Sequence, residues 1–293
     1  TEWNAANTVI GQTSSVSDNR ELRDVNSAQQ LKSEEIAEMK EKGAKAESVV
    51  KALVEKSSSW EQKTALAQDK YVRRKISKHS SDIVSELPTA ERVARVAFYD
   101  KSGRGDSLRP DILGLALHRA ALTGGSRAAV FETCNGLMLG AVAERLGATG
   151  TVSLFTPPSF RGTQLPYYAR TLARPVATIK MVPFEPLLKT LDGPNLFLNT
   201  TNVDQVQSLV IATSTYRPLE VFAALWPLLE PGRPFVIWSN SLTDLEQVTS
   251  LAINTLACDF NPCETWFRDI QVLPERTHPT TEMHGSSGFL LYG

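Results

Sequence analysis

From about residue 81 onward, short apolar segments of strand length alternate with longer segments of helical pattern. This alternation is typical of parallel strands joined by crossover helices, because a parallel pair needs a connection long enough to cross the sheet. We therefore predict an α/β fold built on a doubly wound sheet. The predicted strands are residues 128–131, 151–155, 208–212, 235–238, 266–273 and 289–292, with residues 92–99 either strand-like or the start of a connection. The predicted helices are residues 112–117 (ending near Gly124 and Gly125), 138–146, 219–229 and 241–256.

The last two predicted strands depart from the parallel pattern. Residues 277–287, which connect residues 266–273 to residues 289–292, show no helical pattern. A connection without a helix favours an antiparallel pair. We expect a hairpin at the edge of the sheet, and the glycines of residues 285–288 suit a turn there better than a phosphate-binding loop.

The composition is that of an ordinary globular protein. Hydrophobic residues make up 42% and charged residues 22% of the 293 residues. No stretch approaches the roughly 18 consecutive apolar residues that a membrane span requires, so we expect a soluble chain with no membrane partner. Three cysteines cannot all pair with one another, which favours a reducing compartment. Because the chain lacks an initiator Met and ends in a strand-like segment, we interpret it as a piece of a longer protein.

Residues 1–80 are expected to form a polar tail followed by a helical linker. Two short helices are expected, one from Ser33 to a glycine stop at Gly43 and one over residues 46–56. Residues 58–61 read Ser-Ser-Trp-Glu and predict a capping box for a third helix, which runs to about residue 78.

The third of these helices carries a run of positive charge. Residues 69–79 read DKYVRRKISKH, with five Lys or Arg residues and one acidic residue, although the whole chain has a net charge of −1. At about 100° per residue, four of these cations fall on one helix face, opposite Val72 and Ile76. Either this face is simply solvated, or it binds an anionic partner that relieves the repulsion between its charges. The four cations are Lys70, Arg73, Arg74 and Lys78.

A predicted strand runs directly into a loop and a helix at residues 132–140, which read ETCNGLMLG. A Rossmann-like methyltransferase of class I has an acid-x-Gly-x-Gly-x-Gly loop here, whose glycines allow a tight turn and the close approach of S-adenosylmethionine. Glu132 and Gly136 keep the acid and the middle glycine, whereas Cys134 and Met138 replace the first and third glycines. We expect the Cβ of Cys134 to obstruct the turn and Met138 to fill space that the cofactor needs. The sequence therefore predicts a degenerate cofactor loop.

Two further strand ends lack the residues that this chemistry requires. The second strand of such a fold ends in an acid that binds the ribose hydroxyls, but no Asp or Glu occurs in residues 151–159. The fourth strand ends near a catalytic Asp, but none occurs between Asp204 and Glu220. We conclude that the fold is retained without the chemistry.

Three long segments resemble the non-catalytic, tRNA-binding subunit of the eukaryotic tRNA adenosine-58 N1-methyltransferase. They are residues 131–150 (FETCNGLMLGAVAERLGATG), residues 67–79 (AQDKYVRRKISKH) and residues 264–293 (ETWFRDIQVLPERTHPTTEMHGSSGFLLYG). The resemblance extends from about residue 27 to the last residue and is weakest over residues 157–206.

The resemblance implies a role inside a larger enzyme. Family members pair with a catalytic sister subunit, and two pairs form a heterotetramer in the nucleus. S-adenosylmethionine and the catalytic Asp belong to the sister, so no cofactor is expected in this chain, which would supply tRNA-binding surface and stability. Residues 1–80 would hold the remnant of an N-terminal β-barrel and the basic linker. Residues 81–293 would form the Rossmann-like domain without a competent cofactor site.

The resemblance also implies residues that contact tRNA. The third helix matches a lysine-rich family segment, and residues 101–109 match a second segment that faces tRNA. Arg217 lies at the end of the lost catalytic strand, and Arg268 either contacts RNA or orders the C-terminal motif. Each single Arg could instead form a structural salt bridge. The implied tRNA-binding residues are Lys70, Arg73, Arg74, Lys75, Lys78, Lys101, Arg104, Arg109, Arg217, Arg268, Arg276 and His278.

Two other functions remain open at this point. An active S-adenosylmethionine-dependent RNA methyltransferase with an atypical loop would bind the cofactor without a partner. A protein scaffold that does not contact RNA would make the tRNA affinity of the complex independent of the basic helix.

A zinc site is the weaker interpretation of the cysteines and histidines. Cys258, Cys263, His278 and His284 have the spacing C-x4-C-x14-H-x5-H, which is close to that of a zinc finger. The residues between them have the pattern of a strand and a proline-containing loop and lack a short finger helix. We therefore expect no metal.

Overall fold

The structure is a computed structural model that describes residues 29–80, 85–99, 108–157, 159–160, 164–171, 177–184, 203–254, 258–272, 277–281 and 286–293. The chain divides into two compact units, residues 1–86 and 87–293, each with its own hydrophobic core. The sequence-based boundary at residue 80 lies close to this division. Residues 1–28, the first part of the segment 1–80 expected to hold the barrel remnant and the basic linker, lie outside the described residues. No helix among the described residues is long and apolar enough to cross a membrane.

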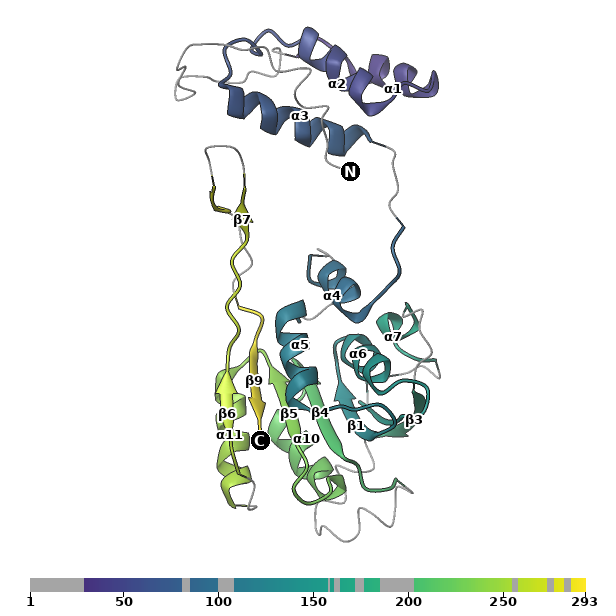
Figure 1. Cartoon of the computed structure of the whole chain (residues 1–293), viewed down its shortest axis with the longest axis vertical. Coiled ribbons are helices and arrows are strands. Elements are labelled where there is room, and N and C mark those ends of the chain that lie inside the picture. The colour runs from purple at the N-terminus through teal and green to yellow at the C-terminus, as the bar shows by residue number, and fades with distance from the viewer. Residues whose placement is uncertain are drawn as a thin grey trace. The chain divides into compact units, whose positions relative to one another are not determined.

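The first unit contains three described helices, α1 (Ser33–Glu41), α2 (Ala46–Glu55) and α3 (Ala65–His79) (Figure 1). The end of α1 follows the predicted glycine stop. Gly43 has φ +77°, and the N–H of Ala44 donates to the carbonyl of Met39 over 2.9 Å, which closes the last turn. Leu31, Val49 and Leu53 form the buried core between these helices.

The start of α3 differs from the prediction. The helix begins at Ala65, where the Thr64 hydroxyl accepts a hydrogen bond from the N–H of Ala67, and no helix starts at residues 58–61. The N–H of Lys63 instead donates to the carbonyl of Trp60, so these residues form turns. The Trp60 ring packs edge-on against Tyr71 of α3 at 5.7 Å, and this tertiary contact favours the turns over a capping box.

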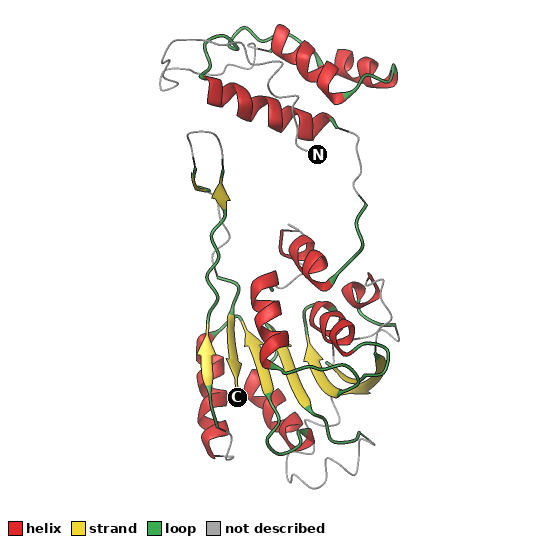
Figure 2. Cartoon of the chain, viewed as in Figure 1, coloured by secondary structure: helices red, strands yellow, loops and turns green. Residues whose placement is uncertain are grey.

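The second unit contains a sheet of seven described strands in the order β3-β2-β1-β4-β5-β9-β6. Figure 2 draws its strands in yellow, with red helices beside them. The strands β1 to β5 are parallel, and β9 is antiparallel to both of its neighbours. This order, which starts in the middle and moves outward in both directions, confirms the doubly wound α/β fold. The strands are β1 (Arg127–Glu132), β2 (Thr151–Thr156), β3 (Thr178–Pro183), β4 (Ser208–Thr213), β5 (Phe235–Ser239), β6 (Asn261–Cys263) and β9 (Phe289–Tyr292).

Side chains alternate along each strand, so each face of the sheet has its own hydrophobic core. Helices cover both faces. In β1, Ala128 and Val130 pack with the core of one face, whereas Ala129 and Phe131 pack with the core of the other. The first core includes α4 (Ala90–Tyr99), α5 (Pro110–Arg119), α6 (Leu137–Leu146) and α7 (Tyr167–Thr171). The second includes α10 (Pro218–Leu225), a short 3₁₀ turn (Trp226–Leu228) and α11 (Leu242–Asn254).

Residues 92–99 form most of α4 and are not a strand. Ala94 and Ala97 are buried, whereas Val96 is 69% exposed. An apolar residue on the solvent face hid the helical period and made the segment resemble a strand. Three further elements, β3, β6 and α7, were not predicted because they are short or carry polar residues on their exposed sides.

The predicted edge hairpin named the wrong partner for the last strand, β9. The described residues 266–272 leave the sheet, and among them Ile270–Gln271 (β7) forms a strand, paired with His278–Pro279 (β8). The strand that pairs with β9 at the edge is β6, which lies earlier in the chain. We call the described residues 264–272 and 277–281 the arm, because they project away from the seven-stranded sheet (Figure 1). Exposed apolar residues gave the arm the appearance of a sheet strand.

Candidate functional site

The loop after β1 has its acidic residue at the centre of its turn. Glu132 is buried, and its Oε1 accepts a hydrogen bond from the N–H of Gly136 over 2.7 Å. Asn135 and Gly136 both have positive φ, at 55° and 92°, and Gly136 precedes the first residue of α6. The Glu132 carboxylate therefore holds the turn that connects β1 to α6, a structural task that does not require a ligand.

Cys134 and Met138 lie in a different place from the one we expected. Both side chains are fully buried, and the Cys134 thiol faces the carbonyl of Ala212 in β4 at 3.9 Å. The left-handed conformations fall on Asn135 and Gly136, so a Cβ on Cys134 does not obstruct the turn. Met138 belongs to the core of α6. These two substitutions fill core space beneath the loop, and the expectation that they block the site directly is wrong.

The loop is instead covered by the residues that lead into α7. A Cβ on Gly136 would lie 2.7 Å from Cβ of Pro166 and 2.8 Å from the backbone nitrogen of Ala169. The N–H of Tyr168 also donates to the carbonyl of Asn135 over 3.0 Å. The space beside the backbone of Gly136 is therefore occupied by Pro166 and α7.

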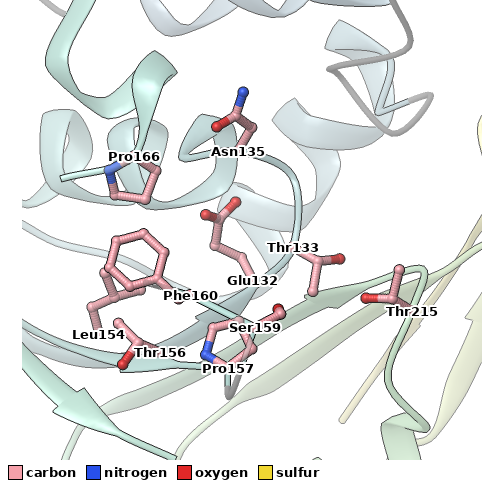
Figure 3. Close-up of a pocket in the computed structure, with 10 residues that line it drawn as sticks. All are labelled: Glu132, Thr133, Asn135, Leu154, Thr156, Pro157, Ser159, Phe160, Pro166 and Thr215. Carbon is pink, nitrogen blue, oxygen red and sulfur yellow. The ribbon is translucent and has the colours of Figure 1, made fainter. Parts of the chain in front are cut away.

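A cavity of about 390 Å³ remains at the carboxyl ends of β1, β2 and β4. In Figure 3, the Glu132 carboxylate lies centrally, with Pro166 on one side and the residues that follow β2 on the other. The lining combines apolar surface with several hydroxyl groups. The lining residues are Glu132, Thr133, Asn135, Leu154, Thr156, Pro157, Ser159, Phe160, Pro166 and Thr215.

The ends of β2 and β4 present hydroxyl groups to this region. At the end of β2, the Thr156 hydroxyl donates to the carbonyl of Val182 over 3.3 Å. At the end of β4, the buried Thr213 hydroxyl accepts from the N–H of Tyr216 over 2.9 Å and donates to the carbonyl of the same residue. Thr213 therefore shapes the local turn, and neither strand end provides the carboxylate that cofactor binding or base catalysis would use.

The charged face predicted on α3 is present in the structure. Val72 is buried on the opposite side, while Lys70, Arg73, Arg74 and Lys78 are exposed. Arg73 pairs with Asp69 over 2.9 Å. Arg74 and Lys78 make no ion pair with any described residue, so their charges are open to solvent.

Lys75 lies at the side of this face. Its Nζ is 5.4 Å from the centre of the Tyr71 ring. Burial and, to a lesser extent, the neighbouring charges of Lys78 and Arg74 lower the pKa of the Lys75 ammonium. The repulsion that the sequence suggested is thus present along α3.

Arg109 is the clearest departure from the predicted tRNA contacts. Its side chain is 5% exposed, and its Nε and Nη2 donate to the two carboxylate oxygens of Asp111 over 2.6 and 2.9 Å. Nη2 also donates to the carbonyl of Thr265 over 2.9 Å, and the guanidinium faces the rings of Phe98 and Phe267. The prediction that Arg109 contacts tRNA is wrong for this structure, because the side chain ties the base of the arm to α5.

The other predicted contacts are dispersed. Arg217 is exposed at the start of α10 and contacts Glu220 and Gln247. Arg268 and His278 are exposed on the arm, where the His278 ring contacts Gln271 at 3.0 Å. Lys101, Arg104 and Arg276 lie outside the described residues.

The arm has an apolar surface that the sequence analysis did not assign to a function. Trp266 is 83% and Val272 is 74% exposed, and Phe267 and Ile270 are each about half exposed. The available signal was the apolar content of this segment, which an ordinary strand shares. Large apolar side chains gathered on one exposed segment are typical of a surface that another protein covers.

The cysteines and histidines do not form a metal site within the described part of the chain. No group of three or more His, Cys, Asp or Glu residues there is arranged to hold an ion. His284, the fourth residue of the zinc-like spacing, lies outside the described residues.

Comparison with known proteins assigns the family. Residues 2–181 match the model of the Gcd10p family. The chain belongs to the Gcd10p family. This finding confirms the resemblance noted in the sequence, which was based on segments in both halves of the chain.

Relatives of this Gcd10p-family chain share one name. This chain is 30% identical to the tRNA (adenine(58)-N(1))-methyltransferase non-catalytic subunit of Dictyostelium discoideum, over 94% of this chain and 63% of the relative. The subunit of the same name from Mus musculus is 25% identical, over 94% of this chain and 73% of the relative. That from Schizosaccharomyces pombe is 26% identical, over 94% of this chain and 75% of the relative.

Solved structures confirm the fold of this family member. An S-adenosylmethionine-dependent O-methyltransferase from Thermotoga maritima matches with a TM-score of 0.53 and 14% identity, over 75% of this chain and 80% of that one. The tRNA (m1A58) methyltransferase TrmI from Aquifex aeolicus matches with a TM-score of 0.51 and 15% identity, over 74% of this chain and 83% of that one. The sheet is therefore that of a Rossmann-like methyltransferase.

Proposed function

We propose that this chain is a non-catalytic subunit of a tRNA methyltransferase that forms N1-methyladenosine at position 58. It binds tRNA and supports a catalytic sister subunit. The observation that carries the proposal is a methyltransferase sheet whose loop after β1 is covered by Pro166 and Ala169. The names of the relatives agree, although the chain spans only 63% of the Dictyostelium protein.

The residues present do not fit S-adenosylmethionine. The fold implies this cofactor, but the ribose-binding acid is missing after β2 and the loop backbone at Gly136 is covered. The proposal therefore assigns the cofactor and the methyl transfer to the sister subunit. One observation favours the alternative of an active enzyme, namely the cavity of about 390 Å³. The absence of a carboxylate at the end of β4 counts against that alternative.

The proposed contribution to tRNA binding comes first from α3. Arg74 and Lys78 are exposed on one face, together with Lys70, and have no ion pair among the described residues. Cations of this kind bind phosphates and release counterions from the RNA. Arg217, Arg268 and His278 are exposed and remain secondary candidates.

The proposed contribution to assembly comes from the arm. Among its apolar residues, Trp266 is 83%, Val272 74% and Ile270 48% exposed. Large exposed apolar side chains suit a protein surface better than a phosphate backbone. We assign this surface to the catalytic subunit. A heterotetramer of two such pairs and a location in the nucleus belong to the same proposal, and sedimentation of the complex and imaging of the tagged chain test them.

Neutralising α3 tests the RNA-binding part of the proposal. Arg74→Gln together with Lys78→Gln, assembled with the catalytic subunit, should weaken tRNA binding and reduce the salt slope of log K by about 1 for each cation removed. Lys51→Gln on the exposed side of α2 is the matched control and should leave both quantities unchanged. Unchanged affinity and slope in the double variant would favour a scaffold that does not contact RNA through α3.

A further inference from the structure

We propose that Arg109 is a positioning residue for assembly, which fixes the direction of the arm before the catalytic subunit binds. This inference rests on the proposed function, in which the arm is the surface for that subunit. It gives a role in association to a residue that is itself too buried to form the interface, because the Arg109 side chain is only 5% exposed.

Arg109, which directly precedes α5, holds the chain at both ends of the arm. Where the chain enters the arm, Nη2 of Arg109 donates to the carbonyl and the hydroxyl of Thr265 over 2.9 and 3.2 Å, and the guanidinium faces the ring of Phe267. Where the chain returns toward β9, the backbone N–H of Arg109 donates to Oγ of the buried Ser287 over 2.8 Å. Figure 1 shows that the arm begins beyond β6 and that β9 lies beside β6. One residue therefore fixes the base of the arm.

A second contact lies further along the arm. The hydroxyl of Tyr99, at the end of α4, donates to Oδ2 of Asp269 over 3.3 Å. The carbonyl of Asp269 accepts a hydrogen bond from the N–H of Thr280 over 3.0 Å, which joins the two sides of the arm. A segment held at one point can turn about that point, whereas contacts with two different helices restrict it to one direction.

These contacts determine where the exposed apolar residues of the arm project. Trp266, which is 83% exposed, lies between Thr265 and Phe267, the two residues that the buried guanidinium contacts. Ile270 follows Asp269 directly and begins β7. A surface that already has its bound direction loses little conformational entropy on association. The same apolar contacts on a freely turning arm would bind more weakly, because only a fraction of the molecules would present them correctly.

The use of a buried arginine supports this role. Removing a guanidinium from water is unfavourable, and an apolar residue of similar volume often gives a fold at least equal stability. An apolar residue lacks directed hydrogen-bond donors, however. Arg109 donates to Asp111 on α5 and to Thr265 on the arm, and its guanidinium faces the rings of Phe98 on α4 and Phe267 on the arm. The planar donor group thus links α4, α5 and the arm with a fixed geometry.

Arg109→Lys tests the inference, because lysine keeps the charge but has a single donor nitrogen in place of the planar fork. It can keep an ion pair with Asp111 while losing the geometry that also reaches Thr265. In the isolated full chain, hydrogen exchange of residues 264–272 should become faster, while that of β1 and β4 should not change.

The kinetics of assembly with the catalytic subunit, measured by surface plasmon resonance, give the decisive readout. The association rate constant of Arg109→Lys should fall about fivefold, because fewer molecules present the arm in its bound direction. The dissociation rate constant should stay the same, since the partner holds the arm in the complex. Trp266→Ser, which removes an apolar anchor, should instead raise the dissociation rate constant.

Two further variants make this test specific. Arg217→Lys is the matched control, because it makes the same substitution at an exposed arginine of α10 that contacts Glu220 and Gln247, and it should leave exchange and both rate constants unchanged. Tyr99→Phe removes only the second contact, at a residue that is 48% exposed, and should slow association about twofold. It replaces Arg109→Lys if circular dichroism shows that the latter does not fold.

The outcomes separate this inference from the proposed function. An unchanged association rate constant, or unchanged exchange in the arm, overturns the inference and leaves the non-catalytic role standing. A change confined to the dissociation rate constant also overturns it, because Arg109 would then act only in the assembled complex. No binding of the catalytic subunit by the unchanged chain overturns the proposed function, and the inference falls with it.

Discussion

Gly136 combines two requirements at a single residue. Its φ of 92° belongs to the left-handed region, and Pro166 and Ala169 pack where a side chain would begin. The Glu132 carboxylate accepts a hydrogen bond from the N–H of this glycine, and this bond requires the same turn. The glycine is therefore retained for the packing of the loop, even though the proposed function requires no cofactor there.

Replacing Gly136 should test this packing directly. Gly136→Ala should lower the free energy of unfolding by about 1–3 kcal/mol, because it adds backbone strain and a clash. Gly114→Ala is the matched control, since no atom lies within 4 Å of its added Cβ in α5, and it should raise stability by about 0.5–1 kcal/mol. Urea unfolding measures both. Equal effects of the two substitutions would contradict the packing described for the loop.

The ion pair between Arg109 and Asp111 makes the stability of the fold depend on pH. Burial pushes the pKa of Asp111 upward, but hydrogen bonds from Arg109 and Thr265 outweigh it, and the net pKa lies below the ordinary value of 3.8. A carboxyl whose folded pKa is lowered stabilises the fold above its unfolded pKa. That contribution is lost as the pH falls through the folded pKa.

Arg109→Met should remove this dependence. The variant loses on the order of 3 kcal/mol at neutral pH, because the Asp111 charge is left without its partner. As the pH is lowered from about 5 to below the ordinary pKa of 3.8, the urea midpoint of the unchanged chain should fall more steeply than that of the variant. A variant whose midpoint falls in parallel with the unchanged chain would show that this pair is not the source of the acid sensitivity.

The sequence identified some of these residues and misjudged others, for physical reasons. Glu132 and Gly136 were found because a strand followed by an acid and a glycine constrains the backbone locally. The interpretation of Cys134 and Met138 was wrong, because the direction of a side chain relative to the sheet is set by packing with β4 and α6. Arg109 was misassigned because its burial depends on Thr265, which lies 156 residues away.

At the scale of elements, α3 and the arm present opposite kinds of surface. The helix exposes cations along one face, whereas the arm exposes Trp266, Ile270 and Val272. The face of α3 could be predicted because helical period fixes it from sequence alone. The departure of the arm from the sheet could not, because an ordinary strand has the same apolar content.

Polar substitution on the arm should weaken assembly without weakening the fold. Trp266→Ser together with Val272→Ser should lower the affinity for the catalytic subunit at least tenfold, because exposed apolar anchors of this size dominate interfaces. The melting temperature of the isolated chain should stay the same. Ile253→Ser, at a residue 62% exposed on α11, is the matched control for a surface apolar residue outside the arm. Sedimentation of the mixed subunits measures the effect, and normal assembly of the double variant would remove the arm from the interface.

At the scale of the whole molecule, the two units have cores of very different size. Three buried residues, Leu31, Val49 and Leu53, form the core among the first helices. The second unit has a large core on each face of its sheet. The α/β class followed from the alternation of segments, whereas the size of the first core depends on contacts that no local pattern reveals.

Hydrogen exchange should reflect this difference. Amides of α2 should exchange faster than those of β1 and β4, because a core of a few side chains opens at a lower free energy than a sheet packed on both faces. Mass spectrometry of peptides from the intact chain measures both. Equal protection would mean that α2 unfolds only together with the second unit. Binding of tRNA should slow exchange in α3, since ligand binding stabilises the bound form.

The position of β9 has a consequence for how the protein is made. The strand lies between β5 and β6, and β6 has no other neighbour among the strands that the structure describes. While the ribosome is still translating the residues before Phe289, the growing sheet ends at β5 and presents an unpaired edge. Such an edge invites pairing with another nascent chain. A premature stop codon upstream of residue 289 would therefore yield a product that aggregates readily and needs chaperones to stay in solution. This holds even though most of the sheet had been synthesised.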